Sequence, residues 1–114
     1  MGINVRFNPF DLIIEITKEL WPDLDCDIYF ADVGEFDGDK AYGVTCFNDS
    51  GTAEIAINPR TPIEGAVEIL AHELAHVVAG EAVEAHGEEW QSAFELINEK
   101  YNCVVEELIG RRGQ

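Results

Sequence analysis

The sequence has 114 residues, 46% of them hydrophobic, and 23 acidic against 7 basic side chains give a formal net charge of −16. That length suits one domain spanning residues 1–114, which buries about two thirds of the surface its unfolded chain exposes. The hydrophobic content excludes an ordinary disordered chain, and the negative field repels phosphate backbones, so we expect no nucleic acid partner.

The cysteines Cys26, Cys46 and Cys103 are widely spaced and form no Cys-x-x-Cys pair. The sequence therefore encodes neither a zinc ribbon nor a thioredoxin-like redox motif. The best explanation for these three cysteines is that they are free, buried thiols in a reducing compartment. No stretch has the length and composition of a signal peptide or a membrane-spanning helix. We therefore expect a cytoplasmic protein with no membrane partner.

The first predicted element is a packing helix. Asn8 and Pro9 open it, Pro9 being suited to a first-turn position, and Pro22 ends it after Trp21. Apolar or small residues recur through it at helical spacing, namely Phe10, Ile13, Ile14, Thr17 and Leu20. We expect this helix to contribute to the core and to carry no chemistry.

Three segments rich in aromatic and β-branched residues follow and predict strands at 26–33, 42–47 and 53–58. The Gly/Asp-rich stretch 34–40 predicts a solvated loop. Asn48-Asp49-Ser50-Gly51 has the composition of a turn. The second and third strands are therefore expected to form an antiparallel hairpin.

A second helix is predicted to begin at a capping box, with Thr61 as the N-cap, Pro62 at the first helical position and Glu64 three residues after Thr61. Gly80 is its natural end. An apolar stripe along it is expected to face the core, comprising Ile63, Val67, Leu70, Leu74 and Val78. The opposite side is expected to face a cleft.

That opposite side carries the motif His72-Glu73-Leu74-Ala75-His76. Histidines at i and i+4 share one helix face with Cβ atoms about 5–6 Å apart, close enough to bind one metal ion. Zinc hydrolases of this pattern use the glutamate as general base. The third and last histidine, His86, follows ten residues later. The alternative is a chance match in which the histidines are merely hydrogen-bonded on an amphipathic helix.

Three histidines with no cysteine nearby favour an open catalytic zinc site, because structural zinc sites usually close all four positions with cysteines. We therefore expect one Zn²⁺ per chain, bound by His72, His76 and His86. Zinc would lower the pKa of its water to about 7, and Glu73 could move the proton to a leaving amine. Glutamates after the motif compete with His86 as third ligand, namely Glu81, Glu84, Glu88, Glu89 and Glu95.

A third helix should start near Glu88 and Glu89, whose charges suit a helix N-terminus. Its predicted core stripe begins with Trp90, which we expect to anchor the helix, and continues with Phe94, Ile97 and Tyr101. Residues 104–109 leave room for a last strand or short helix.

The runs Ile55-Ala56-Ile57-Asn58-Pro59-Arg60, HELAH at 72–76 and HGEEW at 86–90 together resemble the SprT-like (Spartan-type) branch of the zincin metallopeptidases. The resemblance covers about Ala53 to Tyr101. It implies a minimal zincin α+β fold, with an N-terminal helix, a small, mainly antiparallel three-stranded sheet, the HExxH helix and a C-terminal helix. It also implies the same zinc ligands, Glu73 as general base, and a substrate-binding strand edge near Tyr42–Phe47.

The sequence also departs from relatives of this pattern. Spartan-type proteins act on proteins crosslinked to DNA through basic or zinc-ribbon regions, which this chain lacks, so that role does not transfer. Metzincins place a glycine and a histidine where Ala79 and Ala82 stand. Tyr42, Tyr101 and Arg60 are candidates to stabilise an oxyanion, and we take Tyr42 and Arg60 as substrate-binding.

Three functions are compatible with these residues. The favoured one is a zinc metallopeptidase that hydrolyses peptide bonds in a peptide or protein substrate. The second is a non-catalytic zinc-binding zincin-fold protein with an interaction or regulatory role, which Glu73 argues against because only chemistry needs that carboxylate. The third is an acidic mimic of a nucleic-acid surface in which the motif is incidental.

Overall fold

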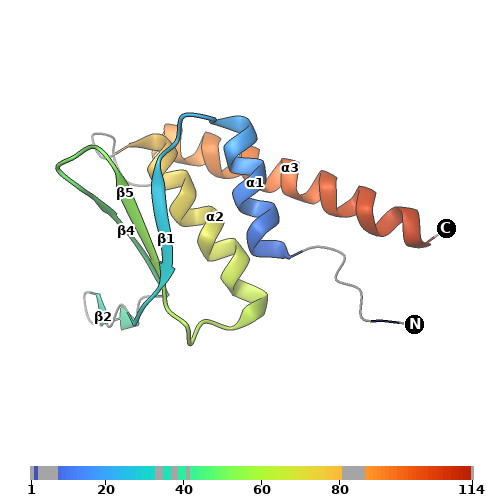
Figure 1. The fold of residues 1–114 in the computed structure, drawn as a ribbon, viewed down its shortest axis with the longest axis horizontal. Coiled ribbons are helices and arrows are strands. Elements are labelled where there is room, and N and C mark those ends of the chain that lie inside the picture. The colour runs from blue at the N-terminus through green and yellow to red at the C-terminus, as the bar shows by residue number, and fades with distance from the viewer. Residues whose placement is uncertain are drawn as a thin grey trace.

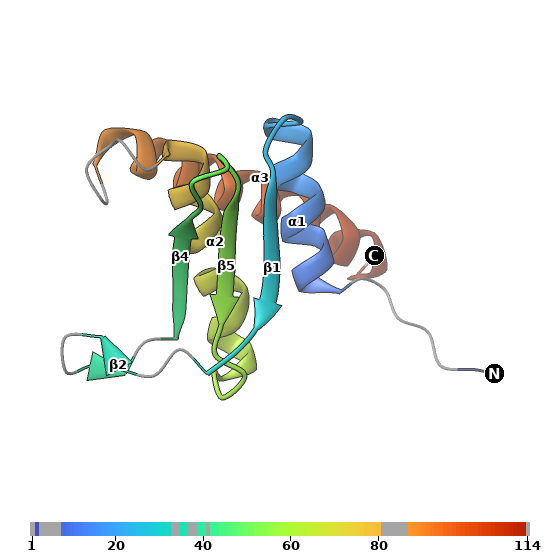
Figure 2. The same cartoon turned by 60° about the vertical axis from the view of Figure 1, so that its left-hand side comes forward.

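The computed structural model describes residues 2, 8–32, 35–36, 39–40, 42–80 and 87–113. These residues form three helices and a three-stranded sheet, and Figures 1 and 2 show the helices on one side of that sheet. The predicted α+β class is confirmed, as is the order of an N-terminal helix, strands, a motif helix and a C-terminal helix. In the described part of the chain, no helix is both long and apolar enough to cross a membrane.

Helix α1 spans Pro9–Leu20 and confirms the first predicted element. The Asn8 side chain accepts a hydrogen bond from the Phe10 backbone N–H at 2.9 Å, which caps the helix. At the other end the N–H of Trp21 donates to the Thr17 carbonyl. The side of α1 that carries Ile13 and Thr17 is buried, so this helix packs as expected.

The sheet has the strand order β1-β5-β4, with β1 at Cys26–Phe30, β4 at Gly43–Phe47 and β5 at Ala53–Ile57. Strands β4 and β5 form the predicted antiparallel hairpin. Strand β1 is parallel to β5, so the sheet is mixed. This arrangement leaves β4 at one edge of the described sheet, with β5 in the centre, as Figure 2 shows.

Two short strands lie where the sequence predicted only a loop. Strand β2 (Glu35–Phe36) pairs antiparallel with β3 (Asp39–Lys40) as a separate two-stranded sheet. Each of these strands has only two residues, which is too short for the alternating pattern by which a strand is predicted from sequence. Residues 33–34, 37–38 and 41 lie outside the described part, including the end of the predicted first strand.

Helix α2 spans Ile63–Ala79, and its N-terminus corrects the predicted capping box. The N-cap is Pro62, and no side chain caps it. The Thr61 hydroxyl instead donates to the Asn58 carbonyl at 2.6 Å, back into the turn after β5. At the C-terminus the prediction is confirmed, because Gly80 ends the helix with a φ of 91° that suits glycine.

Helix α3 spans Glu88–Gly113 as one continuous helix, so residues 104–109 extend it rather than forming a separate element. Neither glycine nor proline interrupts the sequence between 88 and 109. Figure 1 shows its C-terminal half projecting beyond α1. Ile109 near this end is 57% exposed.

The core lies between the helices and the sheet, around Ile13, Ile55, Ile57, Leu70, Ala71, Leu74 and Ile97. On α2 the predicted stripe is correct for Leu70 and Leu74, but Val67 and Val78 are only half-buried. Alanines are buried instead, at positions 66, 71 and 75. Their small side chains let α2 approach its neighbours closely, which a search for large apolar residues does not detect.

The three cysteines are free, as expected, but they are not all buried. Cys46 and Cys103 are exposed and Cys26 is half-buried. Cys46 lies on β4, one residue from the helix-facing Thr45, and successive strand residues point to opposite faces. The expectation of buried thiols is therefore wrong for Cys46 and Cys103.

Candidate active site

The two motif histidines lie on one side of α2 with their rings in contact. The ring centroids of His72 and His76 are 5.0 Å apart at an interplanar angle of 71°. Both residues are half-buried. This arrangement confirms the i, i+4 geometry expected of the motif, and brings two imidazoles together.

Aromatic side chains of α3 form a wall against these rings. The Trp90 ring centroid lies 4.8 Å from that of His72 and 5.6 Å from that of His76. Trp90 stacks on Phe94 at 4.9 Å, and its Nε1 donates to the His72 carbonyl at 3.1 Å. Trp90 thus anchors α3 to α2 as predicted, and it also limits the space in which the two imidazoles can turn.

The motif glutamate faces another element, the edge strand β4. Glu73 is only 7% exposed, and its Oε1 accepts a hydrogen bond of 2.6 Å from the Thr45 hydroxyl. Burying an ionised carboxylate costs free energy unless it is paired or hydrogen-bonded. The contact with Thr45 offsets part of that cost and holds the side chain against β4.

Gly43, two residues before Thr45, also lies close to α2. A Cβ atom built at Gly43 would lie 2.7 Å from Ile69 Cγ2 and 3.3 Å from Glu73 Oε2. A larger residue there would force the Ile69 side chain, and to a smaller extent that of Glu73, to shift. The sequence analysis assigned no role to Gly43 or Thr45. Their alternation on β4 was visible in the sequence, but the helix that they face was not.

The third predicted ligand, His86, lies outside the described residues, as do Glu81 and Glu84. Among the residues that are described, no three His, Cys, Asp or Glu side chains form a group suited to a metal ion. The donors that are described fit zinc, since imidazole nitrogens are among its preferred ligands. His72 and His76 would supply two of the positions of such a site.

The two predicted substrate-binding residues precede different elements of the site, Tyr42 strand β4 and Arg60 helix α2. Tyr42 directly precedes Gly43, and its side chain is 45% exposed. Arg60 is exposed and precedes α2, whose first residue lies about 15 Å along the helix axis from Glu73. Tyr101, the third oxyanion candidate, packs against the core. Of the three, Tyr42 directly adjoins Gly43 in the chain, the position at which an added Cβ atom would meet Glu73.

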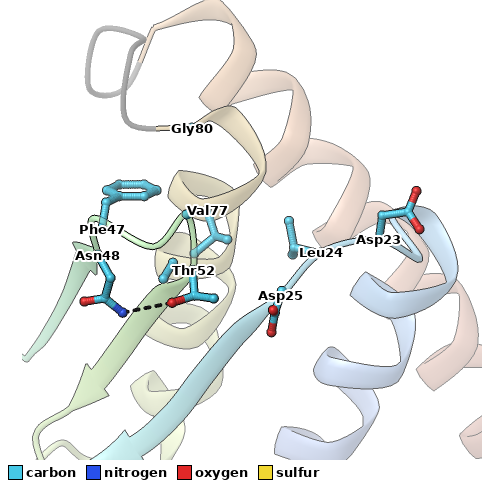
Figure 3. Close-up of a pocket in the computed structure, with 10 residues that line it drawn as sticks. Asp23, Leu24, Asp25, Phe47, Asn48, Thr52, Val77 and Gly80 are labelled. Carbon is cyan, nitrogen blue, oxygen red and sulfur yellow. Dashed lines mark hydrogen bonds between the residues drawn. The ribbon is translucent and has the colours of Figure 1, made fainter.

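A pocket of about 380 Å³ lies between α2 and the sheet, about one helical turn after Glu73. Its wall includes Phe47, which shares the helix-facing side of β4 with Thr45, and Val77, four residues after Glu73. Figure 3 shows Asp23 and Asp25 on the opposite side of the pocket, and the hydrogen bond from Asn48 to Thr52 near its base. The pocket is distinct from the histidine pair.

Two pKa shifts are found on β1, away from the motif. Partial burial, followed by the charges of Asp25 and Asp27, raises the pKa of the Cys26 thiol. The charge of Glu54 is the main cause that raises the pKa of the exposed Tyr29 phenol. Both shifts favour the neutral forms of these groups, so neither creates a reactive anion at neutral pH.

Comparison with known proteins gives one match. The model of the SprT-like family matches residues 39–108, which include β4, β5, α2 and most of α3. Neither the curated proteins nor the solved structures gave a match. The matched region covers more than half of the 114 residues and contains the whole HExxH helix together with the edge strand against it. The chain therefore belongs to the SprT-like family.

Proposed function

We propose that the chain is a zinc-dependent peptidase in which Glu73 is the general base and one Zn²⁺ is held by His72, His76 and His86. Membership of the SprT-like family makes this a zincin-type, metallopeptidase-like domain. What we propose beyond family membership is that the chain hydrolyses peptide bonds. The observation that carries it is the buried Glu73 carboxylate, held against the edge strand on the helix that also carries the two neighbouring imidazoles.

Glu73 is the only charged side chain that is buried among the residues described. A helix whose task was only to pack could place an apolar residue there at no desolvation cost. Groups kept in costly environments are concentrated at functional sites. The position of Glu73 therefore supports a catalytic role over a purely structural or regulatory one.

Zinc held by these histidines would acidify a water molecule and polarise a substrate carbonyl. Glu73 would accept the proton that the water loses as its oxygen bonds to the carbonyl carbon. As the C–N bond breaks, Glu73 would pass that proton to the leaving amine nitrogen. The carboxylate then returns to its starting state. Thr45 would hold one carboxylate oxygen during both transfers.

The substrate we propose is an extended peptide segment. Strand β4 is at the edge of the described sheet, so the side away from β5 presents backbone groups to which another strand can pair. Peptide segments are often bound in this way, with main-chain hydrogen bonds giving affinity. A segment along β4 would pass next to Gly43 and Thr45, the residues in contact with Glu73.

The test is cleavage of a diverse peptide library by the zinc-loaded protein, followed by mass spectrometry. We expect cleavage to be lost when a chelator removes the metal and to return when zinc is added. Bound zinc without cleavage of peptides or unfolded proteins would instead indicate a non-catalytic zinc-binding protein. Cleavage that persists after complete metal removal would contradict the proposed mechanism.

A further inference from the structure

The helix-facing side of the edge strand contacts the proposed general base through two residues. The β-sheet register pairs Gly43 with Ile57 and Thr45 with Ile55, both buried in the core, so Gly43 and Thr45 face the helices. Thr45 Oγ1 lies 2.6 Å from Glu73 Oε1 and 3.3 Å from the Glu73 carbonyl oxygen. Because the hydroxyl has only one proton to donate, its main hydrogen bond is the shorter one, to Glu73 Oε1.

The two carboxylate oxygens of Glu73 meet different groups of β4. Oε1 accepts the Thr45 hydroxyl, while Oε2 lies beside Gly43, where a Cβ atom would approach it to 3.3 Å. A carboxylate on a long side chain has several rotamers, and burial alone does not select among them. The hydrogen bond and the close backbone approach together restrict the carboxylate to one position against the strand.

From this geometry we infer that Thr45 is a positioning residue for the proposed catalytic base: its hydroxyl sets the orientation of the Glu73 carboxylate, and Gly43 provides the space that the contact needs. Thr45 takes no part in proton transfer. Its effect is on how often Glu73 is correctly placed, and misplacement by about 1 Å can reduce a rate by about 100-fold. This inference rests on the proposed peptidase function.

The same strand would then have two tasks. Its outer edge would bind the substrate backbone, and its inner face would hold the base that acts on that substrate. Because Thr45 belongs to the strand that a peptide would pair with, its hydrogen bond links the base on α2 directly to the strand that would hold the scissile bond. Without that bond, the position of Glu73 relative to the strand would depend only on how α2 and the sheet pack.

The test compares Thr45→Val, which removes the hydroxyl and nearly keeps the shape, with Thr45→Ser, which keeps the hydroxyl. We expect kcat for peptide cleavage to fall about 10- to 100-fold in Thr45→Val, with KM changed less than about twofold. Thr45→Ser should recover most of the loss. Thr52→Val is the matched control, because Thr52 belongs to the same hairpin but bonds to Asn48 and Ser50.

A second measurement on the zinc-loaded protein needs no turnover. With ¹³C-labelled glutamate carboxyl carbons, Glu73→Gln identifies the Glu73 signal. That signal should move in Thr45→Val and stay in place in Thr45→Ser and Thr52→Val. If Thr45→Val does not fold, which its melting temperature would show, Thr45→Ala replaces it in both measurements.

Different outcomes separate the two proposals. If the parent cleaves peptides and Thr45→Val has the same kcat, or leaves the Glu73 signal unmoved, the positioning role is wrong and the peptidase function stands. A fall in kcat that Thr45→Ser does not recover also overturns the role of the hydroxyl. If the zinc-loaded parent cleaves nothing, the proposed function is wrong and the positioning role falls with it.

Discussion

Replacing Glu73 by glutamine is expected to reduce peptide hydrolysis about 10²- to 10⁴-fold, the range typical for loss of a general base. The amide that replaces the carboxylate cannot accept and return the proton, yet its oxygen can still accept the Thr45 hydroxyl that now bonds to Glu73 Oε1. The fold should therefore be kept. The measurement is the initial rate of cleavage of the best library peptide at saturating zinc.

Glu68→Gln is the matched control for this variant. Glu68 is an exposed glutamate of the same helix, so the substitution makes the same change of charge without touching the site. We expect the control to cleave at the parental rate, and both variants to bind zinc and melt like the parent. Equal rates for Glu73→Gln and the parent would show that Glu73 is not the base.

The second large effect is expected at the third zinc ligand. His86→Ala should weaken zinc binding by more than about 100-fold, because loss of a residue that only orients a ligand already costs about 10- to 100-fold. Glu84→Ala, Glu89→Ala and Glu95→Ala should each bind zinc almost as the parent does. The measurement is a competition titration against a chromophoric zinc chelator.

The described part of α3 supports His86 over the glutamates of that helix as the third zinc ligand. The side of α3 that meets His72 and His76 carries Trp90 and Phe94, whose rings occupy the contact. Glu89 and Glu95 are exposed on the same helix. Imidazole is also a good zinc donor at neutral pH. Near-parental affinity in His86→Ala, together with a large loss in one glutamate variant, would assign the third position to that glutamate.

Local sequence signals predicted much of this fold. Pro9 and Pro22 bracket α1, a turn-forming run joins β4 to β5, and Gly80 ends α2; each depends on residues close together in the chain. The pairing of β1 with β5 was not predicted, because the two strands lie more than twenty residues apart and neither sequence specifies its partner. The parallel pair makes the sheet mixed.

The candidate site likewise has features that the local sequence predicted and features that depend on long-range packing. The spacing within HELAH was enough to predict two imidazoles on one face of α2, since helix periodicity fixes it. The contact between Thr45 and Glu73 joins residues 28 positions apart and depends on how closely β4 packs on α2. The wall formed by Trp90 likewise depends on the packing of α3. These neighbours, which restrict the motif side chains, become visible only in the folded chain.

Zinc at α2 is the claim on which the roles of Glu73, His86 and Thr45 all depend. The most direct measurement is the zinc content of the purified protein by elemental analysis, after metal removal and reconstitution with excess unbound zinc washed away. The account predicts one zinc per chain in the parent and a loss of that zinc in a His72→Ala/His76→Ala double variant that still folds. A parent that holds no zinc after reconstitution would contradict it.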